Sequence, residues 1–219
     1  DRSPLKKVFG YLSSKNRSLP DFEEFLDQSR KIFHPMIENS RITNQEAHFE
    51  IALKKLIYQF DIPLNEDISL KKLLEIYYME VYSKRKLYPE VISVLNSLQS
   101  IGVRMGVVSN TTNPRFMKEN EMKAAGLEPF FDFAIYSSDT PYRKPHPSIF
   151  QLAIESLKLK PKEILFVGDN LRLDIVGAQN VGMKSAWINR EHKTNSIDGK
   201  PDYELHSLID LLRIDSPAL

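Results

Sequence analysis

Residues 163–188, EILFVGDNLRLDIVGAQNVGMKSAWI, contain two short apolar runs on either side of a stretch with helical spacing. The runs at 163–167 and 184–188 have the length and composition of buried β-strands, whereas 171–180 repeats apolar residues three and four apart. Two strands joined through a helix by short connections run parallel in one sheet. This segment therefore predicts part of a parallel β-sheet with a helix packed against it.

The same alternation of short apolar runs and helical stretches extends back to Pro89 and forward to the end of the chain. Repetition of this kind indicates an α/β fold in which helices cover both faces of a parallel sheet. The further strands are predicted at 103–108 and 131–136, and the further helices at 89–100, 115–125, 147–157 and 203–213.

The first part of the chain has a different character. Only one of the eight glycines precedes residue 102, and tight strand-to-helix turns are where glycine is needed. Three long segments repeat apolar residues at helical spacing, and Ser3, Asp21 and Asn44 are residue types that start helices. We expect about four helices here. Residues 1–88 then form a helical domain and residues 89–219 an α/β domain.

The charge balance argues against a general nucleic-acid binder. The 219 residues include 30 Lys and Arg against 29 Asp and Glu, a formal net charge of +1, whereas such binders need a strongly positive surface. The absence of cysteine excludes disulfides, zinc-thiolate sites and a thiol nucleophile. No apolar run approaches the roughly 18 residues of a membrane span. We therefore expect a cytoplasmic protein that binds neither nucleic acid nor membranes.

Polar residues follow three of the predicted strands, at the end of a parallel sheet where ligands bind. Ser109 and Asn110 follow the first strand, and Lys144 lies after the second. Asp169 follows the third, with Asp174 in the next helix. Taken singly, these residues also fit a helix cap, a solvated lysine and a salt bridge. Taken together, hydroxyl and ammonium groups suit phosphate oxygens and carboxylates suit Mg²⁺, so the pattern indicates phosphoryl-transfer chemistry.

Three motifs resemble those of the haloacid dehalogenase-like hydrolase superfamily. They are VVSN (107–110), YRKPHPSIF (142–150) and VGDNLRLDIVGAQNVGM (167–183), which are similar to the superfamily's second, third and fourth motifs. The resemblance covers roughly residues 89–190. It implies a Rossmann-like core, and it implies that the helical residues 1–88 form a cap that closes over the substrate.

The same resemblance implies a role for each candidate site residue. Ser109 and Asn110 would bind phosphate, and Lys144 would stabilise the phosphorylated intermediate. Asp169 would ligate Mg²⁺, and Asp174 would support that site. The superfamily's dehalogenase branch works without Mg²⁺ and lacks an aspartate at the position of Asp169. This residue therefore favours hydrolysis of a phosphomonoester over dehalogenation, while phosphonate cleavage and mutase activity stay open.

The superfamily's first motif has no counterpart in these 219 residues. That motif is a strand ending in Asp-x-Asp-x-Thr or Val, and it supplies the nucleophilic and the acid/base aspartates. Asp1-Arg2-Ser3 has no strand before it, and Asp61 lacks the second aspartate. In the superfamily's sheet the first-motif strand is central, between the strands that end at Ser109 and Asp169. We therefore expect a strand that ends in aspartate within about 10 residues before Asp1.

Two hypotheses of different class follow. The first is a Mg²⁺-dependent phosphatase that acts on a small phosphorylated metabolite through an aspartyl-phosphate intermediate. The second is a non-catalytic phosphate-binding protein that keeps the fold without the nucleophile. A haloacid dehalogenase is the remaining alternative.

Overall fold

The computed structural model describes residues 2–15, 18–83, 85–194 and 199–214. The chain folds as two compact units, one made of Asp1–Lys86 and Thr112–Glu121 and the other of Leu87–Thr111 and Met122–Leu219. The chain therefore passes from one unit to the other three times. Asp1, considered above for the first motif, lies outside the described residues.

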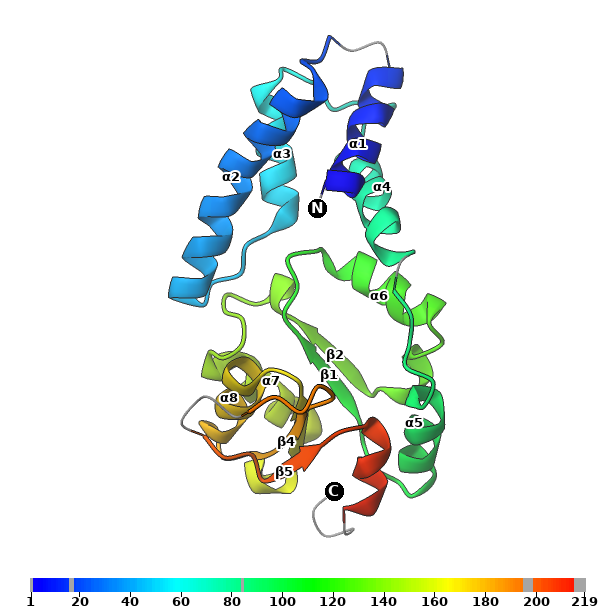
Figure 1. The fold of residues 1–219 in the computed structure, drawn as a ribbon, viewed down its shortest axis with the longest axis vertical. Coiled ribbons are helices and arrows are strands. Elements are labelled where there is room, and N and C mark those ends of the chain that lie inside the picture. Colours follow the sequence, from blue (N-terminus) through cyan, green and yellow to red (C-terminus); the bar gives the residue numbers. More distant parts are fainter. Residues whose placement is uncertain (1, 16–17, 84, 195–198, 215–219) are drawn as a thin grey trace. The chain divides into compact units, whose positions relative to one another are not determined.

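The first unit is helical, as the apolar spacing predicts. Helices α1 and α4 pack against each other, as do α2 and α3 (Figure 1). Fully buried apolar side chains such as Val8, Phe25 and Leu73 form their common core. The helices are α1 (Arg2–Ser14), α2 (Phe22–Thr43), α3 (Phe49–Gln59) and α4 (Leu70–Tyr82), with the first residues of α6 (Arg115–Ala124).

One of the three predicted helix starts is confirmed. The Oδ1 of Asp21 accepts a hydrogen bond from the backbone N–H of Glu24 (2.9 Å) and caps α2. The prediction for Asn44 is wrong: with φ at 57° it ends α2, because asparagine tolerates the left-handed backbone of a helix C-terminus. Ser3 is also wrong as a cap, since it lies inside α1 and its hydroxyl donates to Glu80 of α4 (2.7 Å).

A carboxylate that accepts three hydrogen bonds connects α6 to α4. Glu121 accepts hydrogen bonds from the Tyr78 hydroxyl, the Lys118 ammonium and the Arg85 guanidinium, the last at 2.5 Å. Burial opposes ionisation of Glu121, but the hydrogen bonds from Lys118, Tyr78 and Arg85 outweigh it and lower the pKa of this carboxyl. The ionised form is therefore the one that stabilises the fold.

We expect Glu121→Gln to lower the free energy of unfolding by about 1–3 kcal/mol at neutral pH. A depressed pKa gives stability that is present above the unfolded-state pKa of about 4.3 and is lost as pH falls through the folded-state value. The gap between parent and variant should therefore shrink in acid. Urea unfolding at pH 7 and below pH 4 measures it. Glu119→Gln, which removes an exposed pair with Arg115, is the control and should change stability by under about 0.5 kcal/mol.

The second unit contains parallel strands in two sheets. Strands β1 (Gly106–Ser109) and β2 (Phe133–Tyr136) form one pair. Strands β3 (Leu165–Gly168), β4 (Lys184–Ile188) and β5 (Tyr203–Leu205) form the other sheet, in that order. The four predicted strands thus exist and run parallel, with ends shifted by up to three residues at β1. The α/β fold class is confirmed.

Helices cover both faces of these sheets. Val108 and Phe166 pack with α7 (Pro147–Leu157) and the short α8 (Gly177–Gln179), whereas Leu165 and Val167 pack with α5 (Val91–Ser100) and the 3₁₀ helix η5 (Leu208–Arg213). Alternate residues of one strand point to opposite faces. The two apolar clusters are therefore the two sides of the sheet, as a doubly covered α/β layer requires (Figure 1).

Two predicted helices differ from the structure. The segment 203–213 is not one helix, because Tyr203–Leu205 pairs with β4 and Ser207 then caps η5 with Asp210 in a capping box. Cross-strand pairing here outweighs local helix spacing. The segment 171–180 begins as a π-helical turn (Leu171–Val176) before α8. Such turns occur mostly at functional sites.

A cavity of about 710 Å³ lies beside the facing edges of β1 and β3. Gly106, Val107 and Val108 of β1 line it, as do Leu165, Phe166 and Val167 of β3. Among the described residues, β1 pairs with β2 alone and β3 with β4 alone. Both strands therefore line one common hollow at edges that have no described partner strand.

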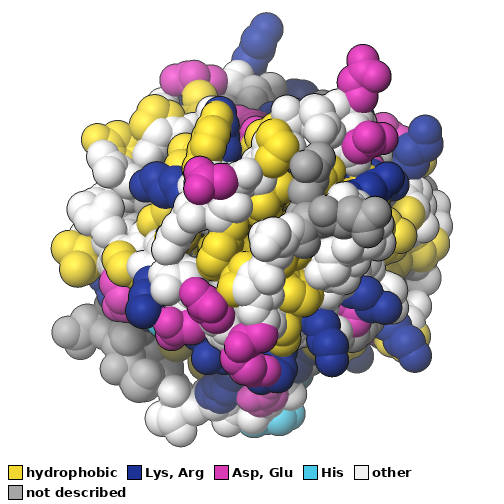
Figure 2. Space-filling view, turned by 90° about the horizontal axis from the view of Figure 1, so that it is seen from above, with side chains coloured by type: hydrophobic (Ala, Val, Ile, Leu, Met, Phe, Trp, Pro, Cys, Tyr) yellow, Lys and Arg dark blue, Asp and Glu magenta, His cyan; other side chains and the backbone are white. Residues whose placement is uncertain are grey.

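The surface carries charges of both signs. On the face drawn in Figure 2, Lys and Arg side chains are interspersed with Asp and Glu, as expected for a net charge of +1. None of the helices in the described part of the chain combines the length and apolar character needed to cross a membrane.

Candidate active site

Three loops meet at the carboxyl end of the strands in the second unit. β1 ends at Ser109, which lies opposite Tyr136 of β2, and Lys144 lies in the loop that leads from β2 to α7. β3 ends at Gly168, directly before Asp169. The parallel arrangement thus brings polar groups that are far apart in sequence to one edge.

The Lys144 side chain is buried at the centre of this edge. Its ammonium pairs with Asp174 Oδ1 (2.7 Å), donates to the carbonyl oxygen of Val108 (2.9 Å) and lies 5.3 Å from the ring centroid of Phe166. An ammonium has three N–H donors. One donates to Val108 in the described part of the chain, and the ion pair with Asp174 is formed in addition, so donor capacity remains for a ligand.

Asp174 is 4% exposed and is held from two sides. Its Oδ2 accepts from the backbone N–H of Asn170 (3.0 Å), while Oδ1 faces Lys144. A side chain at Gly168 would place its Cβ 2.4 Å from the Cβ of Asp174. Glycine at this position therefore lets Asp174 pack against the end of β3. The salt-bridge interpretation of Asp174 is thus confirmed.

Asn110 contacts the backbone of Lys144. Its Nδ2 donates to the Lys144 carbonyl oxygen (3.0 Å), and its Oδ1 accepts from the Lys144 N–H (2.8 Å). This two-point contact fixes the loop that carries the ammonium. One amide hydrogen of Asn110 remains for a ligand. The hydroxyl of Ser109 forms no hydrogen bond with the described residues.

Asp169 is exposed at the tip of β3. Its backbone oxygen accepts from Trp187 Nε1 (3.1 Å), and its carboxylate has no hydrogen bond or ion pair in the described part of the chain. Trp187 is 3% exposed and belongs to the core. Across the described ranges, no three His, Cys, Asp or Glu side chains gather as a metal-binding group.

Sequence reasoning missed Ser137. This fully buried residue follows β2 directly, and its hydroxyl accepts from the backbone N–H of Thr111 (2.8 Å), joining the loops after β1 and β2. The signal available was a serine immediately after a predicted strand. It is indistinguishable in sequence from an ordinary turn residue.

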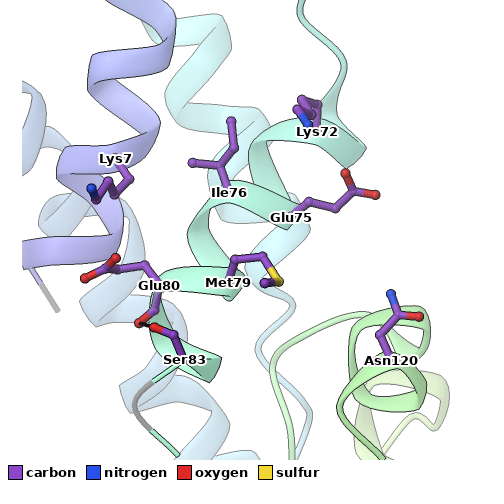
Figure 3. Close-up of a pocket in the computed structure, with 8 residues that line it drawn as sticks. All are labelled: Lys7, Lys72, Glu75, Ile76, Met79, Glu80, Ser83 and Asn120. Atoms are coloured by element: carbon purple, nitrogen blue, oxygen red, sulfur yellow. Dashed lines mark hydrogen bonds between the residues drawn. The ribbon is translucent and has the colours of Figure 1, made fainter. Parts of the chain in front are cut away.

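The first unit has a hollow of its own, of about 590 Å³ (Figure 3). Ile76 and Met79 of α4 point into it, and charged side chains of both signs, such as Lys7 and Glu80, surround them. Their charges and aliphatic chains offer no arrangement suited to a nucleophile or a metal ion. The candidate catalytic groups therefore lie at the strand ends of the second unit.

Known proteins are similar to this chain. Residues 5–188 match the family model described as haloacid dehalogenase-like hydrolase. Pyrophosphatase PpaX of Bacillus mycoides is 39% identical over 129 residues, which are 58% of this chain and 59% of that protein. The protein of the same name from Bacillus anthracis is 38% identical over 129 residues. The chain thus spans less than two thirds of the length of these relatives.

Solved structures share the fold. An HAD phosphatase from Thermococcus onnurineus is 29% identical with a TM-score of 0.63, covering 97% of this chain and 91% of that chain. A 2-haloacid dehalogenase from Pseudomonas syringae has a TM-score of 0.71 at 21% identity, covering 96% and 90%. At that identity the second likeness shows the fold alone.

Proposed function

The chain belongs to the haloacid dehalogenase-like hydrolases, and we propose that it is a Mg²⁺-dependent phosphatase that hydrolyses the monoester of a small phosphorylated metabolite. The observation that carries the proposal is the Lys144 ammonium, which is largely buried, pairs with Asp174 and donates to the end of β1 with donor capacity remaining. A fixed cation at a strand end suits the charge that develops on a transferring phosphoryl group.

Each residue of the site has a role in this proposal. Ser109 and Lys144 bind phosphate oxygens, with the remaining amide hydrogen of Asn110 as a further donor. Asp174 holds the Lys144 ammonium in place. Asn110 holds the Lys144 backbone, so the phosphate site is rigid before the substrate arrives.

The residues present could supply some of the ligands of a Mg²⁺ ion. Mg²⁺ in phosphate-handling proteins is bound through one or two carboxylates, water and the substrate phosphate. Asp169 supplies one carboxylate that has no partner among the described residues, whereas the Asp174 carboxylate forms an ion pair with Lys144. The ion would neutralise phosphoryl charge when bound. A second carboxylate would come from the nucleophile strand.

That strand is the second element of the proposal. A strand between β1 and β3 would enter the cavity, pair with both strand edges that lack a described partner and join the two sheets into one. If this strand runs parallel to β1 and β3, the residue that follows it lies between Ser109 and Asp169. An aspartate there is placed to attack phosphorus and form the aspartyl-phosphate.

The helical part is proposed as the substrate-covering domain. In this division residues 1–88 act as the cap and residues 89–219 as the catalytic core. A second candidate substrate is inorganic diphosphate, because the similar Bacillus proteins are pyrophosphatases. A non-catalytic phosphate-binding protein and a haloacid dehalogenase remain as outcomes of the tests below.

In the protein that bears the nucleophile strand, we expect Asp169→Asn to remove most Mg²⁺ affinity and Mg²⁺-dependent hydrolysis while leaving the fold intact, because the side chain is exposed at the sheet edge. Calorimetric titration with Mg²⁺ and a phosphate-ester screen with and without EDTA measure both effects. Asp132→Asn is the matched control, since Asp132 precedes β2 at the opposite end of the sheet. Full turnover in EDTA would contradict the metal role, and turnover of 2-haloacids there would support a dehalogenase.

A further inference from the structure

A tight turn between β2 and α7 carries Lys144. The backbone N–H of His146 donates to the carbonyl oxygen of Arg143 (2.9 Å), which closes a four-residue turn with Lys144 as its second residue. Asn110 binds both backbone groups of Lys144 from the neighbouring loop. The ammonium lies at the end of a four-carbon chain, so the backbone direction at this turn decides which groups the ammonium can reach.

Two aromatic side chains hold the ends of this turn together. Tyr142 lies two residues before Lys144 and His146 two residues after it, and their rings stack with centroids 4.0 Å apart and 13° between the ring planes. The carbonyl oxygen of Tyr142 accepts from the Thr140 hydroxyl (2.8 Å), which anchors the residue before the turn. The two rings therefore fasten one side of the turn to the other.

The His146 ring is also attached to a rigid helix. His146 is the N-cap of α7, and its Nδ1 accepts from the backbone N–H of Ser148 (3.2 Å). Phe150, near the start of α7, is fully buried and fixes the helix in the core. A Cβ at Gly177 of α8 would lie only 3.3 Å from the Cα of Pro145, so the turn itself packs closely against a second helix. The ring of His146 thus gives Tyr142 a fixed surface to stack on.

We propose that Tyr142 and His146 are positioning residues for the phosphate-binding cation. Their stacked rings hold the turn in the conformation from which the Lys144 ammonium pairs with Asp174 and donates to Val108. The inference rests on the proposed phosphatase function, in which Lys144 binds a phosphate oxygen. A cation that is already in place binds an anion without first losing the conformational freedom of a mobile turn.

Calorimetric titration of the 219-residue chain with inorganic phosphate tests the proposal. Tyr142→Ala removes the stack and keeps the cap on α7, whereas His146→Asn removes the ring and keeps a residue type that caps helices. We expect each variant to weaken phosphate binding about five-fold, which is about 1 kcal/mol. The double variant should lose no more than either single variant, because both substitutions remove the same contact. Tyr142→Phe retains the ring and should keep the parent affinity.

A double-variant cycle with Lys144 separates positioning from a general loss of structure. In Lys144→Ala protein there is no ammonium to position, so Tyr142→Ala should cause no further loss of phosphate affinity. His192→Asn is the control, because it breaks a different stacked pair, that of His192 with His206 (4.1 Å). It should leave phosphate affinity unchanged. Urea unfolding of each variant shows that the fold is retained.

The results that would overturn the proposal are distinct from those that would overturn the phosphatase site. Unchanged affinity in both Tyr142→Ala and His146→Asn would overturn the positioning role alone. An equal further loss when Tyr142→Ala is added to Lys144→Ala would do the same. Failure of the parent to bind phosphate, or of Lys144→Ala to weaken it, would overturn the phosphatase site and the inference together.

Discussion

An apolar strand that ends in aspartate, joined upstream of Asp1, is expected to raise both the stability and the phosphatase activity of the 219-residue chain. The facing edges of β1 and β3 carry backbone groups that no described strand pairs, and the cavity beside them is lined by apolar side chains. An unpaired backbone group that is kept from water costs about 1–3 kcal/mol. With a net stability of only about 5–15 kcal/mol for a domain, pairing both edges is a large gain.

The same strand that ends in asparagine is the matched control. Both strands should raise the midpoint of urea unfolding by a similar amount, because both pair with β1 and β3. Only the version that ends in aspartate should hydrolyse phosphate esters with Mg²⁺. Its turnover should exceed that of the control by several orders of magnitude, because asparagine cannot replace aspartate as the nucleophile.

Two results would contradict this prediction. Unchanged stability with either strand would mean that the cavity does not accept a parallel strand. Equal stabilisation by both strands without hydrolysis would favour the hypothesis of a non-catalytic phosphate-binding protein. The intact mass of the natural protein is an independent check, since a mass of 25.3 kDa would mean that no such strand precedes Asp1.

Lys144→Ala is expected to give the largest loss of any single substitution in the site. A cation that acts on transition-state charge typically contributes several kcal/mol, which is at least a hundred-fold in turnover, whereas one hydroxyl donor contributes about 1–3 kcal/mol. Lys144→Ala should therefore reduce turnover in the strand-bearing protein, and phosphate affinity in the 219-residue chain, by more than Ser109→Ala does. Steady-state kinetics and phosphate titration measure the two effects.

A structural effect must be separated from this loss. Removal of Lys144 leaves the Asp174 carboxylate buried without its partner, which costs about 3–5 kcal/mol when a buried pair is broken. The double variant Lys144→Met with Asp174→Asn removes both charges and should regain most of the stability but none of the phosphate affinity. If Lys144→Ala and Ser109→Ala both hydrolyse phosphate esters at the parent rate, the anion site is misplaced.

The residues of the candidate site could be found from the sequence because strand ends have strong local signals. The apolar runs before Ser109 and Asp169 end abruptly, and polar residues follow at once. Parallel strands place those ends at one edge whatever the details of packing. The helices of the first unit were predictable for the same reason, since helical spacing is a local property.

Other features depend on groups that are distant in sequence. The strand Tyr203–Leu205 follows from pairing with β4, which leaves no local signal. The contact of Asn110 with the Lys144 backbone spans 34 residues.

The sequence by itself determined the α/β class, the helical first part and the identity of the polar groups at the strand ends, because apolar periodicity and strand-end composition are properties of single segments. Only the tertiary structure decided that Lys144 forms an ion pair with Asp174 and donates to Val108, that Asn110 binds the lysine backbone, and that β1 and β3 line a common cavity. These facts depend on which segments meet, and close packing and backbone pairing fix that only when the whole chain is folded.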